Sequence, residues 1–148
     1  MSNFLALQAP IMARLRSALD AAGLLTVPVL GQPDITSVDG TLPAPAVVVS
    51  FEGYSVAEIS AQSRRVTITQ MWDATVITRH TAAIGPGTAA IAQSGTITDI
   101  VMTSLMGWHP PDSAGPLQLI SPDQPSIERG YHYLPIRVEG KLYRAATP

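Results

Sequence analysis

Cysteine is absent from the 148-residue chain, which excludes a disulfide framework and any metal site built from thiolates. Charge is also scarce, because Asp, Glu, Lys and Arg make up 14% of the residues, where about a quarter is usual. The net charge of −2 gives no electrostatic footprint for nucleic acid or an anionic membrane. With a mean hydropathy of +0.22, such a chain is expected to bury part of its surface against partners.

Long hydrophobic runs are missing as well. The longest, residues 44–49 and 100–106, fall far short of the roughly 18 residues that a membrane span requires. The N-terminal stretch lacks the positive start of a secretory signal, and Arg14 and Arg16 lie within its apolar pattern. We therefore expect no membrane partner, and a chain that stays in the cytosol where it is made. The length is that of one domain, residues 1–148.

Two segments have the periodicity of amphipathic helices. Apolar residues recur at steps of three and four over residues 4–22, which predicts a helix that begins near Ala9 and ends at Gly23. A second helix is predicted to end at Met106. It begins either at Thr88 or, because Gly95 weakens the first half, only at Ser94.

The strand signals are strongest in the middle of the chain. Residues 65–77 alternate as one long strand, or as two strands joined at a bulge near Asp73. One face of this run carries several threonines, which is typical of a half-solvated or partner-facing surface. Residues 53–63 are polar and are predicted to form a loop. Further strands are predicted at residues 27–30, at a sheet edge, and at 46–51, 117–120 and 131–138, the last with a possible extension to 142.

This order of elements, α-β-β-β-α-β-β, predicts the fold class. We expect an α+β domain with a mainly antiparallel or mixed sheet and two helices packed on one face. Pro135 within the last strand predicts that this strand lies at an edge or carries a bulge, because proline cannot donate to a strand ladder.

Candidate catalytic and metal-ligating residues are few and scattered. His80, His109 and His132 have no second ligand at helical spacing and are interpreted as surface or interface histidines. Asp73, inside the long strand, is interpreted as an acid on the solvent face or at a bulge, although a buried acid there would be a site candidate. We assign no catalytic, cofactor-binding or metal-binding residue. Glu52 and Glu58 are expected to form surface ion pairs with Arg64 and Arg65.

Several short motifs, taken in order, resemble the phage tail terminator proteins. The N-terminal helix ending at Gly23 leads through a proline-rich stretch to the strand of residues 45–49, and then to Gln70-Met71-Trp72. The predicted second helix ends in Leu105-Met106-Gly107-Trp108-His109-Pro110, and the final strand is the aromatic segment 130–138. The resemblance covers roughly residues 5–140.

The resemblance implies structural work in the virion without catalysis or a cofactor. Such proteins form a homo-hexameric ring on the head-proximal end of the tail tube, assembled in the host cytoplasm. The ring stops polymerisation of the tail tube protein and offers its other face to head-tail connector or stopper proteins. DNA passes through the lumen without specific binding, and a sequence pI of about 5.8 is compatible with such a lumen.

A ring requires one patch to meet a different patch on the next copy. The hypothesis for ring or tube contacts is the predicted loop 53–63 with the strand 65–77, because this region combines a threonine face with little charge. The residues assigned to it are Thr67, Thr69, Met71, Tyr54, Glu58, Arg64 and Arg65.

Two other functions stay open at this stage. The chain could be another neck component, a head-tail connector or stopper subunit that contacts the portal side. A small cytosolic enzyme or ligand-binding domain would instead need a deep pocket in which Asp73 and the histidines converge.

Overall fold

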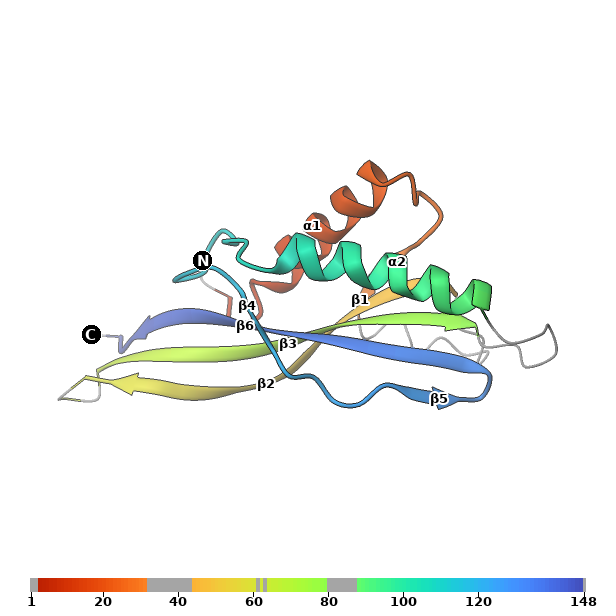
Figure 1. The fold of residues 1–148 in the computed structure, drawn as a ribbon. Coiled ribbons are helices and arrows are strands. Elements are labelled where there is room, and N and C mark those ends of the chain that lie inside the picture. The colour runs from red at the N-terminus through yellow and green to blue at the C-terminus, as the bar shows by residue number, and fades with distance from the viewer. Residues whose placement is uncertain (1–2, 32–43, 61, 63, 80–87, 148) are drawn as a thin grey trace.

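The computed structural model of the protein describes residues 3–31, 44–60, 62, 64–79 and 88–147 (Figure 1). These residues form an α+β domain, as predicted. Its elements are α1 (Gln8–Ala21), β1 (Val29–Gly31), β2 (Ala46–Ile59), β3 (Arg65–Arg79), α2 (Thr88–Leu105), β4 (Gln118–Ile120), β5 (Ser126–Glu128) and β6 (Tyr131–Ala145).

One open sheet contains all the described strands, in the order β1-β2-β3-β6-β4, with β5 also paired to β6. The sheet is mixed, because β1 runs parallel to β2 whereas the other pairs are antiparallel. Both helices lie on the same face of this sheet (Figure 1). The predicted arrangement of two helices on one face of a mixed sheet is therefore confirmed.

The core lies between the helix pair and the sheet. Each helix buries one stripe at helical spacing, which is the pattern that its apolar residues predict. From the sheet, Trp72 and Val76 of β3 point into this layer and are almost fully buried. The helical residues that meet them are Ile11, Leu15 and Leu19 of α1 and Ile97, Val101 and Leu105 of α2.

The long central strand β3 is continuous. It pairs with β6 over its whole length, from Arg65 opposite Ala145 to Arg79 opposite Tyr131. Of the two alternatives predicted for this run, one long strand is therefore confirmed, and there is no bulge near Asp73. The irregularities lie in the neighbouring strand β2, between Phe51 and Gly53 and between Val56 and Glu58. Gly53 has φ +115°, a conformation that favours glycine.

The loop predicted over residues 53–63 is wrong, because β2 continues to Ile59 and pairs with β3 throughout. The polar composition misleads because this end of the sheet lies beyond the helices, so neither of its faces needs to be fully apolar (Figure 1). One further strand of the structure was not predicted from the sequence. This is β5, at residues 126–128, and all three of its residues are exposed.

Other boundaries differ less. The second helix begins at Thr88, the earlier of the two predicted starts, and the last strand runs on to Ala145. Pro135 does not lie on an outer strand, because β6 has neighbours on both sides. It lies instead in the gap between the β6 residues that pair with β5 and those that pair with β4. None of the helices in the described ranges is long and apolar enough to cross a membrane.

Candidate assembly surface

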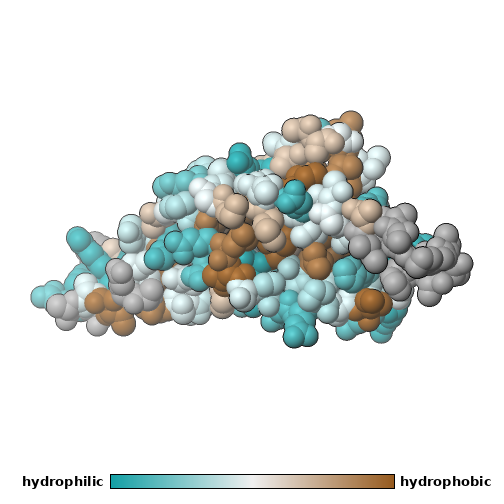
Figure 2. Space-filling model, viewed as in Figure 1, coloured by the Kyte–Doolittle hydropathy of each residue, from teal (hydrophilic) through white to brown (hydrophobic). Residues whose placement is uncertain are grey.

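The far end of the β2–β3 hairpin projects beyond both helices (Figure 1). In the described part of the chain, β1 pairs with only three residues of β2, so Ser50–Ile59 has a neighbouring strand on one side only. Figure 2 shows apolar residues among polar ones over this projecting end. The exposed apolar side chains here are Tyr54 (56%), Val56 (48%) and Ile59 (62%) of β2 and Tyr143 (68%) of β6. We call these four residues, with the strand ends that carry them, the hairpin end.

Three of the residues assigned to the contact surface, Thr67, Thr69 and Met71, share the helix-free face of β3. Of the two alternatives expected for this face, half-solvated or partner-facing, the first is wrong for the threonines, because their exposed fractions are only 7% and 8%. β3 is a central strand, and the β6 residues directly opposite the two threonines are the long side chains of Tyr143 and Lys141. Threonine content therefore indicated the helix-free face correctly and its exposure wrongly.

The other assigned residues are divided between the two faces of the hairpin end. Tyr54 lies on the helix side, where its ring meets that of Phe4 edge to face at 5.2 Å. Glu58 pairs with Thr67 in the β2–β3 register, and its side chain lies outside the described part of the structure. Arg64 and Arg65 are exposed where β3 begins. The structure thus brings Arg65 close to Thr67 but places Tyr54 away from them.

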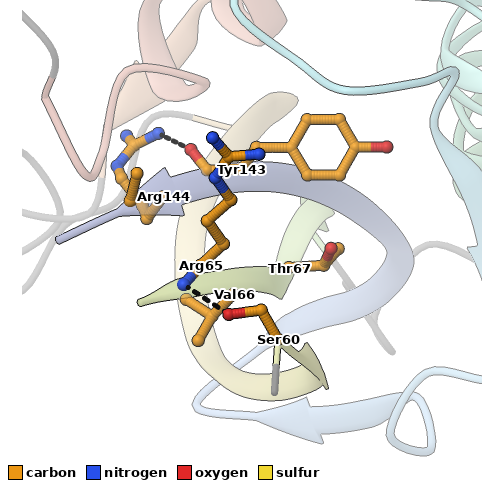
Figure 3. A pocket seen from close by; sticks show the side chains of 7 residues that line it. Ser60, Arg65, Val66, Thr67, Tyr143 and Arg144 are labelled. Atoms are coloured by element: carbon orange, nitrogen blue, oxygen red, sulfur yellow. Dashed lines mark hydrogen bonds between the residues drawn. The ribbon is translucent and has the colours of Figure 1, made fainter. Parts of the chain in front are cut away.

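A hollow of about 610 Å³ opens at this end of the sheet (Figure 3). Its polar groups come from the β2–β3 connection, from β3 and from β6. The hydroxyl of Ser60 accepts hydrogen bonds from the backbone N–H of Arg64 at 3.2 Å and of Arg65 at 3.1 Å. Arg144 donates to the carbonyl of Tyr143 at 2.8 Å. Figure 3 shows the Arg65 side chain extending toward the ring of Tyr143. The hollow is lined by Ser60, Arg65, Val66, Thr67, Tyr143, Arg144 and Ala145.

A second polar cluster lies nearer the middle of the helix-free face. Asp73 is 5% exposed and pairs with Arg137 on β6, so the interpretation of Asp73 as a solvent-facing or bulge residue is wrong. Arg137 also lies 3.2 Å from Asp123 and 3.9 Å from Glu52. The hydrogen bonds that Arg137 donates to Asp73 raise the pKa of Arg137 above its already high value, which keeps the guanidinium charged.

The expected ion pair between Glu52 and the hairpin arginines is also wrong, because Glu52 turns to Arg137 and accepts a hydrogen bond from Ser50 at 2.7 Å. Sequence reasoning missed Arg137 as the centre of this cluster. Alternation alone could place Asp73 and Arg137 on strand faces. Only the β3–β6 register, with the two residues directly opposite each other, brings them together.

The histidines do not form a site with these acids. His109 lies in the loop after α2, where its Nε2 is 2.9 Å from the carbonyl oxygen of Ser113. His132 lies in β6 opposite Thr78, on the other face from Asp73, and His80 lies outside the described residues. In the part of the chain that the structure describes, no three His, Asp or Glu residues are placed to hold a metal ion.

Exposed apolar residues gathered at one end of a domain are typical of a subunit that packs against other subunits. Comparison of the sequence with protein families identifies which family of assembly subunits the chain belongs to. Residues 1–141 match the family model of the phage tail terminator protein, so the chain belongs to that family. The family is a structural one, and membership gives the chain a structural role in a phage tail. No match was found among curated proteins.

Proposed function

We propose that the protein caps the head-proximal end of a phage tail tube as a homo-hexameric ring. The ring ends polymerisation of the tube protein and presents its other face to the connector or stopper proteins of the neck. It assembles in the host cytoplasm, and DNA passes through its lumen without specific binding. The family match over residues 1–141 is the observation that carries this proposal.

The surface of the single chain supports an assembly role. The hairpin end leaves four large apolar side chains exposed, although the chain has few charges to keep them soluble. β2 also has an open edge beside them in the described part, and open edges invite pairing with another chain. Contact with a neighbouring subunit would remove the apolar side chains from water and would pair the open edge of β2.

The contact residues proposed for ring or tube are Thr67, Thr69, Met71, Tyr54, Glu58, Arg64 and Arg65. Substitutions at these residues do not test the contacts equally well, because some of the side chains are buried within the single chain. A lysine at the buried Thr67 or Thr69 is expected to disturb the fold of the single chain, which confuses an assembly assay. Substitutions at the exposed Arg64 and Arg65 are expected to leave the fold intact and therefore test contacts directly, whereas Tyr54 also packs against Phe4 within the chain.

Light scattering of the purified chain, with and without tube protein, tests the ring and its partner. We expect the mass of six copies, and binding to the ends of preformed tubes with no further growth. A strictly monomeric chain that ignores the tube contradicts the proposal.

Electron microscopy of virions made without the protein distinguishes a terminator from other neck subunits. Loss of a terminator gives overlong tails, or tails that are not joined to filled heads. Loss of a stopper instead gives heads that leak DNA, and that outcome would move the protein to the portal side of the neck.

A further inference from the structure

Positive charge gathers at one end of the sheet, beside the hollow, with Lys141 and Arg65 on the helix-free face and Arg144 on the helix side. Arg64 and Arg65 stand at the start of β3, and Arg144 and Lys141 stand near the end of β6. Arg144 is occupied by the backbone carbonyl groups of Tyr143 and Asn3. The side chains of Arg64 and Arg65 are exposed, and no carboxylate of the described residues lies within ion-pair distance of either. Among the side chains that the structure describes, which do not include that of Glu58, nothing neutralises these two guanidinium groups, and they face solvent.

Negative charge dominates the remainder of the helix-free face. Arg137 meets three carboxylates, of which Asp73 is buried with it while Asp123 is 80% exposed. Glu128 of β5 joins Asp73 and Asp123 around a second hollow of about 260 Å³. We call this surface the acid face. Its acids are Glu52, Asp73, Asp123, Glu128 and Glu139, against the arginines Arg79, Arg129 and Arg137.

Two of the three cations of the acid face, Arg137 and Arg79, are already engaged. Arg137 holds Asp73 through two hydrogen bonds, and the guanidinium of Arg79 lies 5.8 Å from the centre of the Tyr131 ring. The exposed Asp123 shares its partner Arg137 with the better buried Asp73. The acid face consequently keeps an excess of negative charge that faces solvent.

The two surfaces of one chain cannot meet each other. Arg65 and Asp73 lie eight residues apart on the straight strand β3, which is about 26 Å at the usual rise per residue. The hairpin end is therefore complementary to a surface that a second copy of the chain carries. Contact between two different patches on successive copies is the heterologous geometry that closes a ring.

We propose that Arg64 and Arg65 at the hairpin end of one copy dock against Asp123 and Glu128 on the acid face of the next copy. The inference rests on the proposed ring and specifies which surfaces join its subunits. Exposed ion pairs contribute little affinity by themselves. The apolar side chains of the hairpin end supply affinity, while opposite charges fix which patch meets which and reject the reversed contact.

Charge reversal with restoration tests the contact in the full-length protein. The first variant is Arg64→Glu with Arg65→Glu, the second is Asp123→Arg with Glu128→Arg, and the third combines all four changes. We expect each of the first two to raise the dissociation constant of self-association at least tenfold in light scattering. The third is expected to return to within about threefold of the original chain, because every interface then has opposite charges again.

A matched control reverses two exposed acids on the helix side of the domain. Asp20→Arg with Asp99→Arg changes the net charge as the acid-face variant does, and it is expected to leave self-association unchanged. Thermal unfolding of each variant checks the fold, and recovery in the four-fold variant excludes misfolding as the cause of a loss. Raised salt should weaken association of the original chain.

The outcomes separate the inference from the proposed function. A ring that persists in all variants overturns the docking contact and leaves the terminator proposal standing. Loss in both pairs without restoration also overturns it. An original chain that never self-associates, with or without tube protein, overturns the ring and the contact together. Arginine variants that lose DNA binding but keep the ring would assign Arg64 and Arg65 to nucleic acid instead.

Discussion

Arg137 binds Asp73 through two nitrogens on one edge of its guanidinium group, from Nε to Oδ1 at 2.7 Å and from Nη2 to Oδ2 at 2.9 Å. The pair joins β3 to β6 at the middle of the helix-free face, where only 14% of the Arg137 side chain and 7% of the Asp73 side chain are exposed. Two-point pairing fixes the orientation of the planar group, which a lysine could not reproduce. The pair therefore organises the acid face around a fixed centre.

Asp73→Ala is expected to lower the free energy of unfolding by about 3 kcal/mol, because it leaves a mostly buried guanidinium without its main partner. Urea unfolding followed by circular dichroism measures the loss. Asp123→Ala serves as the control, since its carboxylate is 80% exposed, and should cost less than about 1 kcal/mol. Equal effects of the two variants would contradict the assigned importance of Asp73.

The β6 glycine Gly140 permits a close approach of the N-terminal segment to the sheet. A Cβ atom at this position would lie 2.7 Å from Cδ1 of Leu7 and 3.1 Å from Cδ2 of Leu117, both of them buried. Gly140→Ala is therefore expected to destabilise the fold by about 1–3 kcal/mol, because the packed neighbours must shift.

Gly95 provides the matched comparison for Gly140. A Cβ atom there meets nothing within 4 Å, and the residue lies inside α2. Gly95→Ala should raise stability by up to about 1 kcal/mol, since alanine favours helix over the unfolded chain. Thermal unfolding of both variants should thus give shifts of opposite sign, and a shared sign would contradict the packing at Gly140.

Gln70 links the N-terminal segment to the core. Its side chain is fully buried, donates to the carbonyl of Phe4 at 2.6 Å and accepts from the indole N–H of Trp72 at 3.1 Å. Gln70→Leu leaves the buried indole N–H and the partly buried carbonyl without this partner, so we expect a loss of about 1–3 kcal/mol. Limited proteolysis should also cut faster near Phe4. Gln118→Leu, at an exposed position, is expected to change neither measurement.

The fold was predictable in the region where the helices pack on the sheet, because there the apolar residues of the sequence are the buried ones. The stripes of α1 and α2, and the alternation that puts Trp72 and Val76 on one face of β3, follow from local periodicity. The extension of β2 to Ile59 did not follow, because its polar residues lie beyond the helix layer where a strand needs no apolar face. The local sequence pattern does not show which part of a strand the helices cover.

The candidate site was predictable in part for the same reason. The exposed Arg64 and Arg65 could be located from their place before an alternating strand. The pairing of Asp73 with Arg137 spans 64 residues of sequence and depends on register, to which neither residue's neighbours give a signal. Burial of Thr67 and Thr69 likewise depends on the β6 residues that lie opposite them.

The exposed apolar residues of the hairpin end provide the last prediction. Val56→Asp with Ile59→Asp places charge where the proposed ring or tube contact would exclude water, so assembly should weaken at least tenfold. Both side chains are about half exposed or more in the single chain, and the free energy of unfolding should fall by no more than about 1 kcal/mol. Leu25→Asp, at a position that is 73% exposed between α1 and β1, is the matched control and should assemble normally. Light scattering and tube-end binding measure assembly. If the hairpin variant assembles as well as the Leu25 variant, the hairpin end is a solvent-exposed surface in the virion, and the contacts must be sought elsewhere on the domain.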